Sequence, residues 1–444
     1  MKVAAQMDRR AFLAVTGAIA MLPAARALAA QGDLKGAARE AWIYALPLIE
    51  MANTRQAQSP GLVVNRFHHV RKLTDPSRRQ VTAPNNDTLF SSAWFDLSQG
   101  PVTLTVPNGG HRYLAVQLLD MYTNTNACIS KRTFSREIGP EGGTFTLVGP
   151  GQRSKGPNPI HLATPHGWAL ARILVDGPDD LNAACAAQDL LSLSGPAIPA
   201  AGGYARRNAA PADYFTSAAR LLQSDPPPRQ DRTALARFAA LGLRPGKPFD
   251  PGRLSASDLA EIEAGIAEAR SKIVSAGKSA HFIDGWSYPK ANLGNFEQDY
   301  DYRAIVALVG LAANTPEEAL YLSPQGESGR LFTDDGPYRL QLPTPPPVEA
   351  FWSLTMYEAT DEGQLYLTAN PLDRYSIGDR TKGLRTNSDG SLDIWISRSD
   401  PGGDRTANWL PAPASGPFSL SFRAYWPREE FRDGRYRLPP IERV

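Results

Sequence analysis

Cysteine and histidine are scarce in this sequence. Its 444 residues include two cysteines, Cys128 and Cys185, and six histidines. No CxxC pair occurs, and no two histidines have the HExxH spacing with which one helix face binds zinc. The cysteines either form one disulfide or stay as two buried thiols, because spacing alone does not fix their geometry. We expect no bound metal or cofactor, unless distant histidines assemble a site.

Motifs for nucleophilic and nucleotide-dependent catalysis are also missing. The chain has no G-x-S-x-G elbow, no G-x-G-x-x-G fingerprint and no P-loop. These absences count against a serine hydrolase of the elbow type and against a nucleotide cofactor.

Long apolar runs are missing as well. The run Ala14 to Leu22 is too short for a hydrocarbon core that needs about 20 apolar residues. It follows Arg9-Arg10-Ala11-Phe12-Leu13 and precedes the small-residue site Ala27-Leu28-Ala29. This is the pattern of a cleavable signal peptide over residues 1–29. The mature protein is therefore expected in the periplasm or outside the cell, cleaved near Ala29, with no membrane span.

The paired arginines resemble the signal read by the twin-arginine export machinery, which carries folded proteins. A Sec signal with an arginine-rich start is the alternative. Removing residues 1–29 takes away a charge of +3, so the formal net charge of +2 becomes −1. A nearly neutral mature chain counts against nucleic acid as a partner.

Periodicity divides the rest of the chain. Helical spacing marks residues 30–80, and alternating runs such as Val102/Leu104/Val106 mark residues 81–180. Residues 181–320 are again mostly helical, with Ser255 and Asp258 as a capping-box pattern. Residues 321–444 return to short alternating runs.

The two β segments repeat one order of motifs. Residues 100–107, 112–122, 142–147 and 168–175 parallel residues 336–343, 350–357, 389–396 and 418–426. In the loops, residues 86–94 parallel 314–322, and residues 131–139 parallel 373–378. We predict an α+β, mainly β fold, in which two jelly-roll-like antiparallel β-sandwiches flank a helical insertion.

The motif at residues 85–97 with Gly100-Pro101 resembles the bacterial domain-of-unknown-function family numbered twelve fifty-four. Residues 303–314, 370–379, 408–413 and 425–427 resemble the companion family numbered twelve fourteen, which commonly follows it in exported proteins. The resemblance implies β-sandwiches with helical insertions and a homo-oligomer. It implies no particular reaction.

Polar residues beside aromatic ones are the candidates for a functional site. We assign catalytic roles to Asp87 or Asp120 as acid/base, Tyr122 as proton donor and Arg132 as an anion stabiliser. The candidate ligand-binding residues are Asn85, Asn86, Asn124, Asn370, Arg374 and Tyr375. In the alternative reading, the Asn and Asp residues cap turns and the arginines brace loops.

Comparison of the two copies favours the first sandwich as the site. Asp120 and Asn124 occur in the first copy alone, whereas a tyrosine recurs. The sequence thus predicts an exported protein that binds or processes a small organic or carbohydrate-like ligand, by metal-independent hydrolase or lyase chemistry if it is an enzyme. The alternative is a noncatalytic, oligomeric protein of the cell envelope.

Overall fold

The computed structural model describes residues 33–444 except 59–62, 80, 135–137, 140, 197, 199–201 and 279–280. The predicted signal peptide, residues 1–29, lies outside the described residues. The chain divides into two compact units. Residues 33–45 and 207–272 form a helical unit. Residues 46–206 and 273–444 form a β unit, in whose described part four sheets occur.

The helical unit takes its helices from both ends of its sequence. It holds the start of α2 (Leu34–Gln58), α4 (Pro211–Ser224), α5 (Arg232–Arg237) and most of α6 (Ala256–Lys278). Helix α6 begins at the predicted capping box. The Asp258 amide donates to Ser255 Oγ (3.1 Å), and the Ser255 amide donates to Asp258 Oδ2 (2.8 Å). Helix α2 contains Pro47 and continues beyond it.

The first sandwich consists of an inner and an outer sheet. The inner sheet has the order β1 (His68–His69), β2 (Thr88–Asp96), β8 (His166–Leu174), β4 (Leu114–Asp120), β5 (Thr125–Ser130). The outer sheet has the order β7 (Pro159–His161), β6 (Gly142–Val148), β3 (Val102–Pro107), β9 (Ser192–Ser194). Helix α3 (Leu181–Asp189) adds Ala184 to the core between them.

The second sandwich has the same division. Its inner sheet has the order β10 (Phe282–Ile283), β11 (Trp286–Ser287), β12 (Ala319–Pro324), β19 (Phe418–Pro427), β14 (Val348–Ala359), β15 (Leu365–Tyr366), with β16 (Ser376–Gly378) also on β14. Its outer sheet has the order β18 (Trp409–Pro411), β17 (Leu392–Ser397), β13 (Tyr338–Leu342), β20 (Glu442–Arg443). Helices α7 (Tyr300–Val309) and α8 (Glu429–Arg432) complete this part.

Alternation along the strands builds one apolar core in each sandwich. In β3, Val102, Leu104 and Val106 are buried while Thr103 is exposed, as the period of two predicts. The core of the first sandwich extends from β3 to Ile173 of β8. The second core is separate and includes Phe422 of β19.

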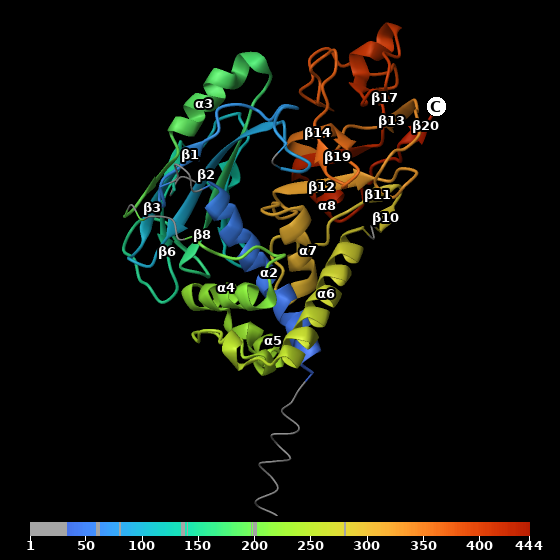
Figure 1. The fold of residues 1–444 in the computed structure, drawn as a ribbon. Coiled ribbons are helices and arrows are strands. Elements are labelled where there is room, and N and C mark those ends of the chain that lie inside the picture. The colour runs from blue at the N-terminus through green and yellow to red at the C-terminus, as the bar shows by residue number, and fades with distance from the viewer. Residues whose placement is uncertain are drawn as a thin grey trace, which may run out of the picture. The chain divides into compact units, whose positions relative to one another are not determined.

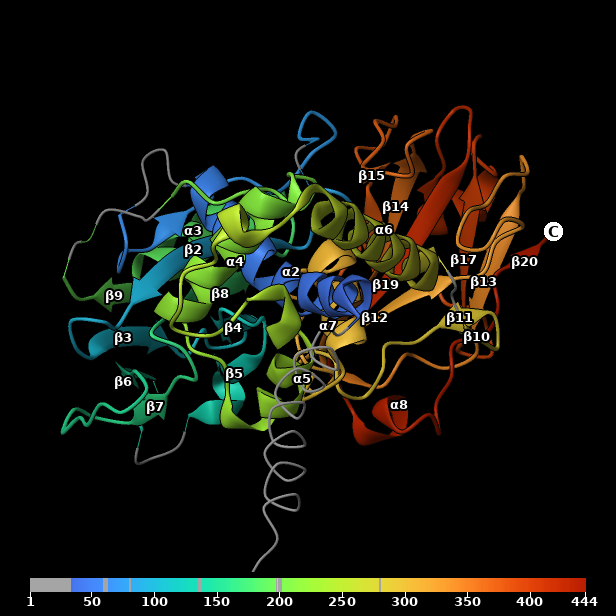
Figure 2. The ribbon, with the colours of Figure 1, turned by 60° about the horizontal axis from the view of Figure 1, so that its bottom comes forward.

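The two inner sheets meet each other through their remaining faces. A third apolar cluster joins Tyr113 and Ala115 of the first sandwich to Phe351, Tyr425 and others of the second. The Phe351 and Tyr425 rings stack with centroids 4.2 Å apart. Figures 1 and 2 show the strands of the two sandwiches side by side. We call this contact the junction.

The structure confirms the predicted α+β, mainly β fold with two sandwich regions. Most strand pairs are antiparallel, whereas β6–β7 and β17–β18 are parallel. The strands β9, β10 and β11 lie in the segment predicted to be mostly helical. None of the helices in the described part of the chain combines the length and apolarity that a membrane span requires.

Candidate functional site

The structure places the predicted site residues at three locations. The junction holds Asn85, Asp87 and Arg132, and Asn86 lies between Asn85 and Asp87 in the chain. Asp120 ends β4, and Tyr122 and Asn124 lie in the turn that follows; the loop before β16 holds Asn370, Arg374 and Tyr375. They do not form one site.

The Asp120 carboxylate organises the turn that follows β4. Its Oδ1 accepts hydrogen bonds from the amides of Tyr122 (2.9 Å) and Asn124 (3.0 Å). Its Oδ2 accepts from the side-chain amides of Asn126 (3.0 Å) and Asn124 (3.3 Å). Thr123 in this turn has φ 68°, a conformation that needs such local support. Asp120 therefore has a structural role, whatever else it does.

Burial and charged neighbours act on Asp120 in opposite directions. Burial raises its pKa, although hydrogen bonds from Asn126 and Asn124 and the charge of Arg303 oppose the rise. Arg303, on α7, lies over the buried Tyr122 ring at 5.4 Å from its centroid. Asp120 contacts Tyr122 through the Tyr122 backbone amide. A substrate would have to replace at least one hydrogen bond to Asp120.

Asp87 is a buried carboxylate at the junction. The Asn85 side chain fixes it by accepting the Asp87 amide (2.6 Å) and donating to the Tyr425 hydroxyl (2.6 Å). Asp87 accepts hydrogen bonds from Ser353 Oγ (2.7 Å) and Arg380 Nη2 (3.2 Å). Both donors belong to the second sandwich, so Asp87 joins the sandwiches.

Arg132 holds a second buried carboxylate at the junction. Its Nη2 donates to Glu318 Oε2 (2.7 Å). Glu318 Oε1 also accepts from the Tyr113 hydroxyl (2.8 Å) and from Trp426 Nε1 (2.8 Å). The Arg132 side chain, 39% exposed, closes this group of buried partners from the solvent side.

The remaining predicted residues hold loops in place. Asn86 Nδ2 donates to a backbone carbonyl (2.6 Å), and Asn370 Oδ1 accepts the Arg374 amide (3.1 Å). Arg374 Nη1 donates to the Trp409 carbonyl (2.8 Å), and the Tyr375 hydroxyl donates to a nearby carboxylate (3.0 Å). These contacts match the alternative reading of these residues as loop braces.

Thiols and histidines form no metal centre in the described part of the chain. No group of three or more His, Cys, Asp or Glu residues is placed there to hold a metal ion. Cys128 and Cys185 are both free thiols, so the disulfide alternative does not hold. Burial and the nearby Glu318 raise the pKa of Cys128. His69 pairs with Ser91 Oγ (2.8 Å), and burial, then the charge of Arg71, lower its pKa.

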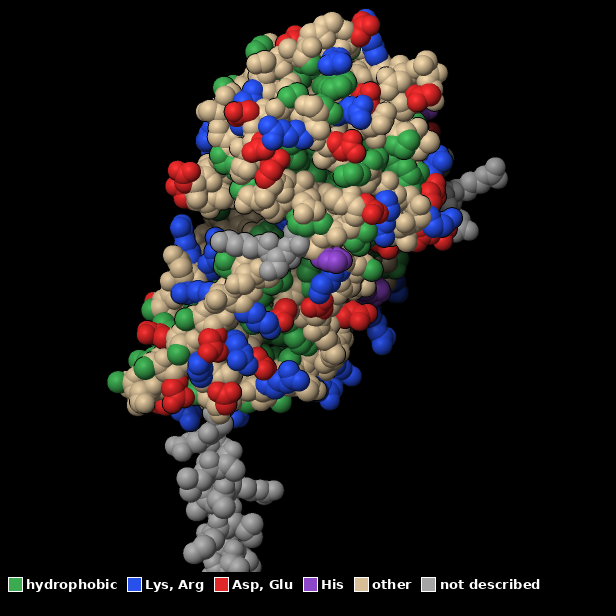
Figure 3. All heavy atoms as spheres, turned by 90° about the vertical axis from the view of Figure 1, so that its right-hand side faces the viewer, with side chains coloured by type: hydrophobic (Ala, Val, Ile, Leu, Met, Phe, Trp, Pro, Cys, Tyr) green, Lys and Arg blue, Asp and Glu red, His purple; other side chains and the backbone are tan. Residues whose placement is uncertain are grey.

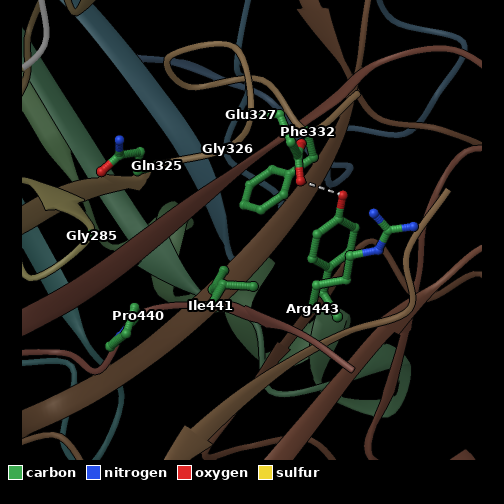
Figure 4. A pocket seen from close by; sticks show the side chains of 9 residues that line it. Gly285, Gln325, Gly326, Glu327, Phe332, Pro440, Ile441 and Arg443 are labelled. Atoms are coloured by element: carbon green, nitrogen blue, oxygen red, sulfur yellow. Dashed lines mark hydrogen bonds between the residues drawn. The ribbon is translucent and has the colours of Figure 1, made fainter. Parts of the chain in front are cut away.

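The second sandwich contains an open pocket of about 330 Å³ (Figure 4). No predicted site residue lines it. Its floor is aromatic, from the buried Phe332 and Tyr338. Its exposed rim is polar, from Gln325, Glu327 and Arg443. The remaining lining residues are Gly285, Gly326, Pro440 and Ile441.

The pocket rim carries charges of both signs. Glu327 accepts hydrogen bonds from the Tyr338 hydroxyl (2.7 Å, dashed in Figure 4) and the Thr333 amide (2.9 Å). Partial burial opposes ionisation of Glu327, but these bonds outweigh it and lower its pKa. Arg443 donates to Asp334 (2.6 Å). Figure 3 shows acidic and basic side chains interspersed on the face that it displays.

Two family models match the two sandwiches. The model described as "Protein of unknown function (DUF1254)" matches residues 64–194, from before β1 to the end of β9. The model described as "Protein of unknown function (DUF1214)" matches residues 317–429, which include β12 to β19. The chain is a tandem DUF1254–DUF1214 protein. We call its sandwiches the DUF1254 half and the DUF1214 half.

One solved structure supports the fold of this DUF1254–DUF1214 chain. The VPA0106 protein from Vibrio parahaemolyticus is 22% identical, with a TM-score of 0.68 over 93% of this chain and 100% of its own. An uncharacterized protein from Burkholderia cenocepacia is 12% identical, with a TM-score of 0.45 over 96% and 98%, too low to inform the fold. A search of curated proteins gave no match.

The sequence predictions missed the ion-pair partners of Asp87 and Arg132. The partner of Asp87 is Arg380, and the partner of Arg132 is Glu318. Glu318 lies in the repeated loop segment 314–322, but the sequence predictions assigned it no role as an ion-pair partner. Two further buried arginines, Arg172 in the DUF1254 half and Arg423 in the DUF1214 half, were also missed. The sequence could have indicated Arg172 and Arg423, because each is a charged residue within an otherwise largely apolar β segment. A charge there is buried and needs partners.

Proposed function

We propose that this DUF1254–DUF1214 protein is an exported binding protein for a small, polar, carbohydrate-like ligand, which it takes up in the pocket of the DUF1214 half. The pocket carries the proposal, because an aromatic floor beneath a rim of hydrogen-bonding groups is the usual makeup of a small-ligand site. Its volume of about 330 Å³ is at the small end of such sites. The proposal therefore moves the ligand from the first sandwich, favoured by the sequence, to the second.

The chemistry of the rim suits hydroxyl groups. A sugar hydroxyl both donates and accepts hydrogen bonds, and the pocket offers the Glu327 carboxylate as acceptor, Arg443 as donor and Gln325 as both. Ile441 and Pro440 give an apolar wall for the C–H face of a sugar ring. Binding without turnover is sufficient for this role.

Ligand-observed saturation-transfer NMR on the mature full-length protein tests the proposal. The panel contains neutral monosaccharides and their uronic acids. We expect at least one member to bind, and Glu327→Gln and Arg443→Ala each to weaken it about tenfold. Arg435→Ala is the control, because Arg435 is an exposed arginine paired with Asp433 and does not line the pocket. Absence of binding, or binding that both pocket variants leave unchanged, refutes the proposal.

A noncatalytic, oligomeric envelope protein is the second candidate. It is favoured by the separation of Asp87, Asp120 and Arg132, each of which is engaged in contacts inside the protein. Sedimentation of the same mature protein separates the two candidates. A discrete oligomer that binds no member of the panel supports the second candidate over the first.

A further inference from the structure

The two inner sheets carry buried arginines at the same place. Arg172 lies on β8, the strand between β2 and β4, and its register partners are Phe90 and Ala115. Arg423 lies on β19, the strand between β12 and β14, with register partners Tyr321 and Ser353. Aligning these arginines therefore aligns the two halves.

This alignment pairs the acids and the outer arginines of the halves. Asp87 lies three residues before Phe90, the β2 partner of Arg172. Glu318 lies three residues before Tyr321, the β12 partner of Arg423. We call Arg172 and Arg423 the central arginines. Ala115 pairs with Ser130, and Arg132 lies two residues after Ser130. Ser353 pairs with Gly378, and Arg380 lies two residues after Gly378. Asp87 thus corresponds to Glu318, and Arg132 to Arg380.

Each half supplies the counterion of the other. Arg132 of the DUF1254 half binds Glu318 of the DUF1214 half at 2.7 Å. Arg380 of the DUF1214 half binds Asp87 of the DUF1254 half at 3.2 Å. Both carboxylates are buried, so each depends on a donor from the opposite half. We call these two ion pairs the exchange pairs.

The central arginines repeat the exchange with hydrogen bonds. Arg172 donates to Gln117 of its own half (2.9 Å) and to Asn314 of the other (3.0 Å). Arg423 donates to Thr355 of its own half (2.8 Å). It also donates to the carbonyl of Ala83, from the other half (3.1 Å). Both arginines are therefore satisfied only when the halves are together.

Hydroxyl groups at the junction distinguish the other half from a second copy of the same half. Ser353 donates to Asp87 (2.7 Å), and the residue that corresponds to Ser353 in the DUF1254 half is Ala115. Tyr113 donates to Glu318 (2.8 Å), and its counterpart in the DUF1214 half is Phe351. Pairing two like halves would remove one hydroxyl donor from each buried carboxylate, at a cost in free energy.

We propose that the junction face of each half is a docking surface specific for the opposite half, so that a DUF1254 sandwich takes a DUF1214 sandwich, and not its own kind, as partner. The exchange pairs give the attraction, and the hydroxyl donors Ser353 and Tyr113 give the preference. This proposal does not depend on the ligand-binding pocket.

The test uses the full-length chain, cut after purification. A protease site in the exposed residues 244–248 leaves one half on each fragment, and the dissociation constant of the nicked protein is measured by dilution. The cut also divides the helical unit, whose contribution is the same in every variant, so the dissociation constants are compared as ratios to that of the unsubstituted nicked protein. We expect Ser353→Ala and Tyr113→Phe each to raise it about tenfold, and Arg380→Met about a hundredfold. The controls are Ser419→Ala and Tyr436→Phe, whose hydroxyl groups bond within the DUF1214 half.

A background variant separates docking from general packing. In a chain that carries Asp87→Asn, the effect of Ser353→Ala is expected to shrink, because its acceptor is no longer charged. Near-UV circular dichroism of the uncut chain shows whether each variant is folded. Ser353→Thr keeps the hydroxyl group, so its dissociation constant is expected to stay near that of the unsubstituted protein. Dissociation constants that match the controls, or an effect that Asp87→Asn does not change, overturn the proposal.

Discussion

Asp379 precedes Arg380 of the exchange pairs and is exposed, whereas Asp87 and Glu318 are buried. Removal of part of its hydration raises the pKa of Asp379 to about 6, and the charge of Asp87 adds to the rise. The Trp352 amide, which donates to Asp379 at 3.2 Å, and the neighbouring Arg380 oppose it. Asp379 therefore changes charge at a pH where an ordinary carboxyl group is already ionised.

This raised pKa predicts a pH-dependent contribution to stability. The folded chain holds the Asp379 proton more tightly than the unfolded chain, so the free energy of unfolding falls as pH rises from about 4 to about 6 and stays level above. Asp379→Asn is expected to stabilise the protein at pH 8, by less than about 1 kcal/mol because solvent screens this exposed group. Below pH 4 the variant should gain nothing.

Melting curves of both proteins between pH 4 and pH 8 measure this difference. Asp389→Asn is the control, because hydrogen bonds from Ser391 lower the pKa of Asp389, so this variant should lose stability by nearly the same amount at every pH between 4 and 8. A gain for Asp379→Asn that is equal at all pH values would contradict the assignment.

At the scale of elements, the start of α6 depends on two side chains. The Ser255 hydroxyl accepts the Asp258 amide, and it also donates to the Asp258 carboxylate (2.8 Å). Ser255→Ala is expected to destabilise the first turn of α6 by about 1 kcal/mol, while Ser255→Thr keeps the hydroxyl and most of the stability. Hydrogen exchange of the amides of residues 256–259 measures the effect. Equal exchange in all three proteins would show that the cap is dispensable.

Short sequence patterns predicted individual helices and strands, but they did not predict which residues pair across the junction. The capping box and the alternation of Val102, Leu104 and Val106 act over a few residues, so the sequence displays them directly. The two residues of one exchange pair lie 186 positions apart in the chain, and those of the other lie 293 positions apart. Their partners are set by how two sheets dock, which no short pattern encodes.

Aligning the copies by motif order also failed in the loops. The sequence alignment placed Arg374 opposite Arg132, but the strand register makes Arg380 the counterpart. The same register places Tyr357 opposite Leu119, so the tyrosine that seemed to recur does not correspond to Tyr122. Because loop lengths differ between the halves, the order of motifs assigns the wrong counterparts in the loops. The register of the paired strands assigns them independently of loop length.

At the scale of the whole molecule, export is the property to test first. If the leader is of the twin-arginine type, replacing both Arg9 and Arg10 by lysine should lower the amount of periplasmic protein about tenfold or more. Arg26→Lys, outside the paired arginines, is the control. Cell fractionation measures the result, and undiminished export of the double variant would assign the leader to the Sec route.

The exchange of counterions between the halves has a consequence for inheritance. A substitution at Arg132 removes the ion-pair partner of Glu318, and one at Arg380 removes that of Asp87. In each pair the two residues belong to different family regions. A gene shortened to one half would encode one acid and two arginines that lack their partners from the other half. We therefore expect compensating changes to arise in pairs, one in each half.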